Sequence, residues 1–117
     1  MSAPLADVIA ETEGDLAVLV ITGEVDLSNV NDVAEAIQRG LPSSGELLLD
    51  LTGVEHLDSA AIAMIDSLRA SGIWVHLIAP ANCPAARLLS MIDVGLPLHG
   101  TRPDAAEALR IGRPGAA

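Results

Sequence analysis

Residues 47–62 read LLLDLTGVEHLDSAAI, and this stretch decides the fold class. Its beginning, Glu46–Leu51, is short and almost uniformly apolar, which predicts a strand buried inside a sheet. The pair Thr52-Gly53 predicts a turn, and Asp58-Ser59 predicts the start of a helix that ends near Ala70. A buried strand followed by a helix is the repeating unit of an α/β sheet.

Glycine, proline and capping residues divide the rest of the chain in the same way. The other predicted strands are at 5–10, 16–23, 73–79 and 96–99. The other predicted helices are at 30–40, from 84 onward, and at 103–111; in the second of these, Leu88, Leu89 and Ile92 are expected to face the core. The order ββαβαβαβα predicts an α/β fold with a mixed, mostly parallel sheet and about four α-helices. We predict a single domain over residues 1–111 and a flexible tail over 112–117.

The composition argues against several classes of function. Of the 117 residues, 16 are Asp or Glu and 6 are Arg, with no Lys, so the formal net charge is −10. Such a surface repels phosphate groups, so we expect neither nucleic acid nor an anionic membrane as a partner. The longest apolar run, around residues 16–22, is too short to span a bilayer, and the N-terminus does not read as a signal peptide. The cytoplasm is therefore the expected location.

Motifs for catalysis and cofactor binding are missing from the sequence. A chain without lysine has no phosphate-binding loop ending in Gly-Lys-Ser/Thr, and no GxGxxG follows a predicted strand. His56, His76, His99 and Cys83 lack the close spacing typical of zinc ligands. Cys83 is expected to be a small buried side chain. We therefore expect no enzymatic activity, no cofactor and no metal.

Three carboxylates follow or end predicted strands, where open α/β sheets place their binding sites. They are Asp26, Asp50 and Asp58. One interpretation makes Asp50 the acceptor of a phosphoaspartate receiver, but receivers also use a lysine, and this chain has none. The simpler interpretation is that Asp50 ends its strand and accepts hydrogen bonds from nearby backbone N–H groups.

The helix that begins at Asp58-Ser59 is apolar on two sides. Counting about 100° per residue puts Ala61, Met64, Ile65 and Leu68 on one side, and Ser59, Ile62, Ala63, Asp66 and Ala70 on the other. In one interpretation Ser59 is an N-cap and Ile62 is covered by a neighbouring loop. In the other, the second side is a protein-docking surface with a modifiable hydroxyl at its edge.

Three motifs together resemble the STAS domains of bacterial anti-sigma factor antagonists: Gly23-Glu24-Val25-Asp26, the run 50–54, and Asp58-Ser59. The resemblance covers nearly the whole chain and implies a STAS-like fold. It also implies that Ser59 is the phosphorylated serine of this family, with Asp58 and Asp26 as its acidic neighbours. The family usually has glycine two residues after the serine, where this chain has Ala61, whose methyl group predicts an obstacle to close approach by a kinase.

The function implied by the resemblance is that of a binding protein. It would capture an anti-sigma factor of the histidine-kinase-like ATPase type, free a sigma factor, and be switched off when that partner phosphorylates Ser59; a phosphatase would reset it. The implied partner-binding residues are Asp26, Asp58, Ser59, Ile62, Ala63 and Asp66. The alternative is an unphosphorylated STAS scaffold or accessory subunit of a sensory or lipid-transport complex. The oligomeric state stays open.

Overall fold

A computed structural model describes residues 5–90 and 96–112 of the chain. Its elements are β1 (Ala6–Glu13), β2 (Leu16–Val25), α1 (Val30–Gly40), β3 (Glu46–Leu57), α2 (Ser59–Ala70), β4 (Trp74–Ile78), α3 (Pro84–Ser90), β5 (Leu98–His99) and α4 (Arg102–Ile111). The predicted α/β class and the element order are confirmed. Ile92 and all of the predicted tail except Gly112 lie outside the described residues.

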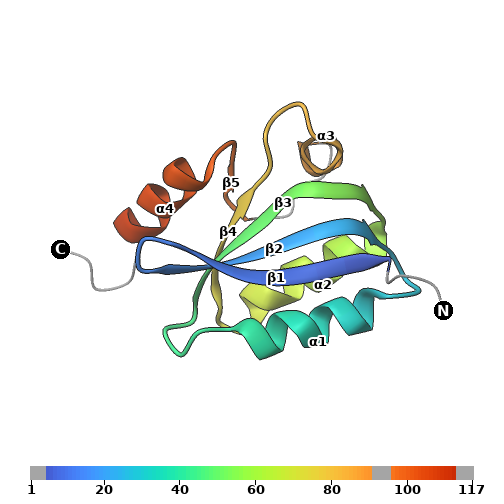
Figure 1. Ribbon diagram of the computed structural model, residues 1–117, viewed down its shortest axis with the longest axis horizontal. Helices are drawn as coiled ribbons and strands as arrows, with labels where there is room; N and C mark the ends of the chain where they lie inside the picture. Colours follow the sequence, from blue (N-terminus) through green and yellow to red (C-terminus); the bar gives the residue numbers. More distant parts are fainter. Residues whose placement is uncertain (1–4, 91–95, 113–117) are drawn as a thin grey trace.

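The strands of the described residues form one five-stranded sheet in the order β1-β2-β3-β4-β5. Strand β1 is antiparallel to β2, and each later strand is parallel to its neighbour, so the sheet is mixed and mostly parallel as predicted. Helices α1 and α2 lie side by side along one face, and α4 lies on the other side of the sheet (Figure 1). Helix α3 packs beside β3.

Strand β3 is longer than the sequence predicts. The turn predicted at Thr52-Gly53 is wrong, because the strand continues to Leu57 and keeps its pairing with β2. A Cβ atom on Gly53 would lie 2.8 Å from Cγ2 of Thr22 on β2, so glycine is needed here for close approach of the two strands. The register shifts between Val20 and Thr22, as expected where a β-bulge adds a residue to one strand. A glycine that suggests a turn in the sequence therefore serves strand packing.

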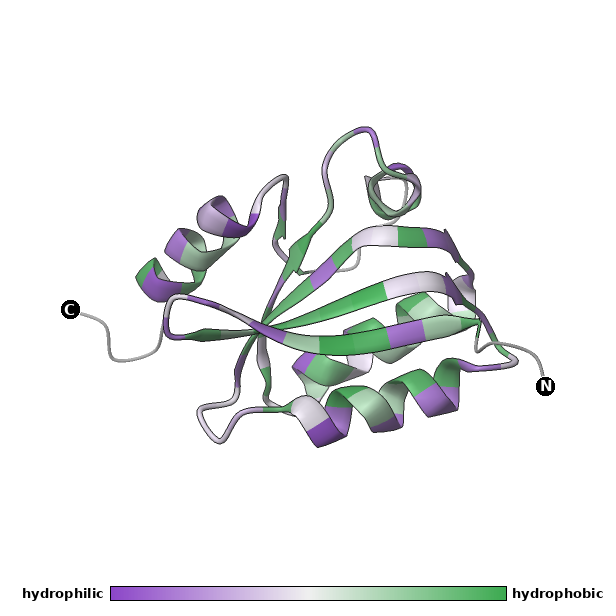
Figure 2. Ribbon diagram, viewed as in Figure 1, coloured by the Kyte–Doolittle hydropathy of each residue, from purple (hydrophilic) through white to green (hydrophobic). Residues whose placement is uncertain are grey.

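The two faces of the sheet bury different clusters. Along β3, Leu47, Leu49 and Leu51 belong to a large core with residues of α1, α2 and α3, whereas Leu48 belongs to a smaller core beneath α4. Successive side chains of a strand point to opposite faces, so the uniformly apolar run is what a strand covered on both sides requires. Figure 2 shows β2 as a largely hydrophobic ribbon, while the helices alternate hydrophilic and hydrophobic stretches. Cys83 is buried in the larger core, as predicted.

A histidine pair joins β4 to β5. Nδ1 of His76 lies 2.9 Å from Nε2 of His99, and the ring planes differ by 6°. The N–N distance is shorter than the about 3.5 Å of van der Waals contact and lies within the range of a hydrogen bond. One neutral imidazole donates to the other. Burial, and then the nearby charge of His99, lower the pKa of His76 below its usual 6.5.

We expect the free energy of unfolding to decrease as the pH falls below about 6.5. Unfolded chains take up a proton on His76 near that pH, whereas the native protein does so only at lower pH because the pKa is lowered. The stability that His76 contributes is therefore fully present above its pKa in the unfolded chain. This stability is lost as the pH falls through its lower pKa in the native protein. Urea unfolding at several pH values between about 5.5 and 7.5 measures the slope. His76→Gln should flatten it, and His56→Gln, on an exposed histidine, should not; an equal slope in all three proteins would contradict this account.

Candidate functional site

The carboxyl ends of β2 and β3 lie at the same edge of the sheet. Val25, the last residue of β2, pairs with Leu57, the last residue of β3. The chain leaves the two strands at Asp26 and Asp58, and the N–H of Asp58 donates to the carbonyl of Val25 over 3.3 Å. The structure therefore brings together two acidic residues that are 32 positions apart in the sequence, since 58 − 26 = 32.

Asp58 connects two elements at this edge. It is the N-cap of α2, where its Oδ1 accepts a hydrogen bond from the N–H of Ala61 over 3.0 Å. Its Oδ2 accepts another from the N–H of Leu27, in the β2–α1 loop, also over 3.0 Å. Both carboxylate oxygens are thus engaged, and the loop is fixed against the start of the helix.

Ser59 occupies the first helical position of α2 and is exposed. The interpretation of Ser59 as an N-cap is wrong, because Asp58 fills that position and supplies the capping oxygen. Within residues 5–90 and 96–112, the Ser59 hydroxyl takes part in no hydrogen bond. The hydroxyl is therefore open to solvent at the positive end of a helix dipole, a place that favours a negatively charged group.

Asp26 organises the β2–α1 loop. Its Oδ1 accepts hydrogen bonds from the hydroxyl of Ser28 and, over 2.8 Å, from the N–H of Ser28. These bonds, the hydroxyl first, lower the pKa of Asp26, and the charge of nearby His56 acts in the same direction. Asp26 is consequently ionised at neutral pH and gives this edge of the sheet a fixed negative charge.

The remaining predicted site residues lie along α2 with different exposures. Ala63 is exposed like Ser59, and Asp66 is half-buried and forms a 3.4 Å ion pair with Arg69. Ile62 is also half-buried, because it packs against the larger core. The opposite side of the helix buries Ala61, Ile65 and Leu68 as predicted. The exposed positions among these residues, Ser59 and Ala63, therefore carry small side chains.

Ala61 lies on the buried side of α2. It is 0% exposed and belongs to the larger core. Its backbone N–H is the group that Asp58 caps, so the residue is turned inward at the first turn of the helix. The methyl group of Ala61 is therefore not on the exposed surface beside Ser59, and its effect on a kinase stays a prediction.

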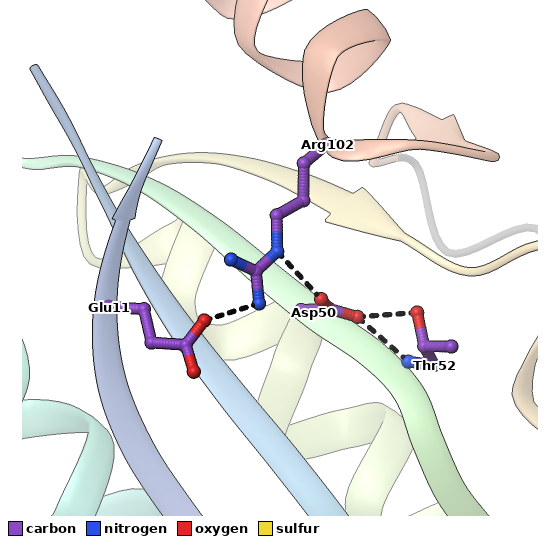
Figure 3. A network of polar contacts seen from close by, with 4 residues as sticks. All are labelled: Glu11, Asp50, Thr52 and Arg102. Atoms are coloured by element: carbon purple, nitrogen blue, oxygen red, sulfur yellow. Dashed lines mark hydrogen bonds and ion pairs between the residues drawn. The ribbon is translucent and has the colours of Figure 1, made fainter. Parts of the chain in front are cut away.

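Asp50 lies away from this edge, in the middle of β3. The whole residue is only 6% exposed. Its Oδ1 accepts hydrogen bonds from the N–H and hydroxyl of Thr52 over 3.0 and 2.6 Å. Its Oδ2 accepts from Nε of Arg102 over 3.1 Å, and Nη2 of Arg102 also pairs with Glu11 at 2.7 Å (Figure 3). The predicted backbone bond is present, but Asp50 does not end its strand. A buried, fully engaged carboxylate also disfavours the receiver interpretation.

The sequence patterns did not point to Leu27, Ser28 or Asn29 as members of the site. Asn29 stands at the N-cap position of α1, but its side chain makes no capping bond. It accepts a hydrogen bond from the N–H of Asp26 and donates one to the carbonyl of Glu24 over 2.8 Å. The local signals for these residues were the helix-capping residue types of Ser28 and Asn29 and an isolated leucine in an otherwise polar turn. The contact of this loop with Asp58, the residue before Ser59, depends on the pairing of β2 with β3.

The described residues contain neither a cluster of metal ligands nor a helix that could span a membrane. No three His, Cys, Asp or Glu side chains there come together as ligands of a metal ion would. No helix in residues 5–90 and 96–112 is both long and apolar enough to cross a membrane.

Comparisons with known proteins agree with this architecture. The family model described as STAS domain matches residues 7–80. The osmosensory protein A of Mycobacterium tuberculosis strain ATCC 25618 / H37Rv is 27% identical over 104 residues, which represent 79% of this chain and 66% of that protein. This chain thus spans slightly less than two thirds of that relative.

Solved structures show the same fold. An anti-sigma factor antagonist from Mycobacterium paratuberculosis has a TM-score of 0.75 at 24% identity, and the match covers 94% of this chain and 99% of the other. The anti-sigma factor antagonist SpoIIAA in its unphosphorylated form has a TM-score of 0.63 at 16% identity, with coverages of 89% and 96%. The Bacillus cell fate determinant SpoIIAA in its phosphorylated form has a TM-score of 0.56 at 17% identity, with coverages of 89% and 100%.

Proposed function

Because this chain belongs to the STAS domain family, we propose that it is an anti-sigma factor antagonist whose binding is switched off by phosphorylation of Ser59. The observation that carries the proposal is the exposed Ser59 hydroxyl at the first position of α2, directly after the capping Asp58. The structures of SpoIIAA, an antagonist of similar fold in unphosphorylated and phosphorylated forms, support a switch of this kind.

The partner is an anti-sigma factor of the histidine-kinase-like ATPase type. Unphosphorylated antagonist captures it and so frees a sigma factor, and the same partner phosphorylates Ser59 with its own ATP; a phosphatase restores the hydroxyl. The binding surface comprises Asp26, Asp58, Ser59, Ile62, Ala63 and Asp66. The antagonist acts by binding, without catalysis, in the cytoplasm where sigma factors and ATP are found.

Electrostatics give the switch its direction. A phosphoryl group adds about −1.5 to −2 charges. In the free protein, the N-terminus of α2 favours that charge and solvent screens its repulsion from Asp58 and Asp26. In the complex the same charges face a surface that fits a neutral hydroxyl, so repulsion and desolvation oppose binding. Phosphorylated Ser59 is therefore tolerated in the free protein, whereas the complex of the phosphorylated protein with its partner dissociates.

Phosphorylation by purified partners tests the proposal. Each histidine-kinase-like anti-sigma factor of the source organism is incubated with this protein and ATP, and intact-mass and peptide spectrometry follow. We expect one phosphate on Ser59 with at least one kinase, none in Ser59→Ala, and normal modification in Ser67→Ala, which removes another exposed serine of α2. Failure of the whole set of kinases to modify or bind the protein would contradict the proposal. A stable complex with a non-kinase partner that survives Ser59→Ala would favour the scaffold alternative.

A further inference from the structure

Leu27 is the most exposed large apolar side chain of the described residues. It is 77% exposed at the tip of the β2–α1 loop, compared with 51% for Ile9 on β1. A single exposed leucine is unremarkable by itself, because much of any protein surface is apolar. The backbone that carries Leu27 distinguishes it from the others.

The loop holds Leu27 in a fixed position. The N–H of Leu27 donates to Oδ2 of Asp58, the residue that also caps α2. On either side of it, Asp26 accepts from the N–H of Ser28, and Asn29 bonds the N–H of Asp26 and the carbonyl of Glu24. A side chain presented on a backbone with this many bonds loses little conformational freedom when a partner covers it. Such pre-organisation is typical of an anchor residue in an interface.

The surroundings of Leu27 indicate what kind of partner surface would receive it. Exposed Ala63 and half-buried Ala60 are small side chains near the start of α2. Because no large side chain projects at these two positions, a partner can approach the helix closely there. Asp58 bonds to the loop itself, and Asp26 and exposed Glu24 add negative charge around its base. A complementary surface has an apolar pocket for one leucine side chain, with Arg or Lys residues at its rim.

We propose that Leu27 is the apolar anchor by which this protein binds its anti-sigma factor, and that the pocket of the partner is apolar with a basic rim. This inference rests on the proposed function and adds a residue that sets affinity and specificity. Asp58 then has two tasks: it caps the helix that presents Ser59, and it fixes the loop that presents Leu27.

Isothermal titration calorimetry with a histidine-kinase-like anti-sigma factor that binds the wild type tests the anchor. Leu27→Ala should weaken binding about ten- to hundredfold, because a buried leucine side chain contributes that much to affinity. Leu27→Met, which keeps an apolar side chain of similar size, should restore most of the affinity. Ile111→Ala is the matched control: Ile111 is 73% exposed but lies at the end of α4, and its loss should leave binding unchanged.

The outcomes separate the anchor from the proposed function. All three variants should unfold at the wild-type temperature, because both side chains are exposed and the bond from residue 27 to Asp58 uses a backbone N–H. Equal affinities of wild type and Leu27→Ala, with Ser59 still phosphorylated, would overturn the anchor and leave the switch intact. Loss of affinity equal in Leu27→Met and Leu27→Ala would also overturn it. If the wild type binds none of the kinases, the proposed function fails and the anchor with it.

Discussion

Replacing Ser59 with aspartate is expected to weaken binding to the anti-sigma factor by about thirty- to hundredfold. Like charges brought together in an interface cost several kcal/mol, and each factor of ten in affinity corresponds to about 1.4 kcal/mol. The aspartate would stand directly after Asp58, whose carboxylate is already fixed by the N–H groups of Leu27 and Ala61. The carboxylate of Asp58 cannot turn away from the new charge without breaking these bonds. Calorimetric titration of wild type and variant with the same kinase, in the absence of ATP, measures the difference.

Ser59→Asn separates charge from size. Asparagine has nearly the volume of aspartate but is neutral, and both residues are tolerated in the first turn of a helix. We expect the asparagine variant to lose only a few-fold in affinity and the aspartate variant to regain part of its affinity at high salt, because salt screens exposed charges. If Ser59→Asp binds as tightly as the wild type, or no more weakly than Ser59→Asn, the repulsion mechanism is wrong.

The largest effect on stability is expected at Arg102, which bridges two strands from the first turn of α4. Removing its side chain in Arg102→Ala should lower the free energy of unfolding by about 2 kcal/mol. Breaking a buried ion pair typically costs about 3–5 kcal/mol of stability. The loss is smaller here because the side chain of Arg102 is 27% exposed and Asp50 keeps its hydrogen bonds to Thr52. The hydrogen bond to Glu11, followed by the interactions with Asp50, raises the pKa of Arg102, so it is always charged in the native protein.

Arg110→Ala is the matched control, because Arg110 lies on the same helix and pairs with Asp15 at 2.9 Å across to the β1–β2 turn. The side chains of Arg110 and Asp15 are 42% and 69% exposed, and exposed pairs contribute about 0–1 kcal/mol. Urea unfolding of the two variants gives the comparison. Asp50→Asn in the Arg102→Ala background should recover part of the loss, since it removes the unpaired buried charge. Equal destabilisation by Arg102→Ala and Arg110→Ala would contradict the importance of burial at Asp50.

Much of the fold could be predicted because it depends on short-range patterns. The run 47–51 is apolar at every residue except Asp50, which favours a strand covered on both faces, and Asp58 next to Ser59 has the residue types typical of a helix start. The prediction was wrong where one residue type serves two purposes. Gly53 reads as a turn residue in the sequence, yet in the sheet it makes room for Thr22 of the neighbouring strand.

The candidate site could be predicted only in part for a similar reason. Helical periodicity assigned Ala61 to the buried side of α2, where the residue is 0% exposed, but periodicity does not show how a kinase approaches Ser59. Asp50 appeared to belong with Asp26 and Asp58 because all three were expected near the carboxyl ends of predicted strands. Its pairing with Arg102, 52 residues later in the chain, takes it out of that group.

The sequence by itself determined the order of strands and helices, the buried side of α2, and the place of Ser59 at the beginning of that helix. These features depend on backbone propensity and side-chain periodicity, which act over a few residues. Only the tertiary structure decided which side chains meet at that helix. The parallel pairing of Val25 with Leu57 brings the β2–α1 loop to Asp58, and the carboxylate of Asp58 then fixes Leu27 in place. Contacts of this kind depend on strand register, which is set by the packing of the whole sheet.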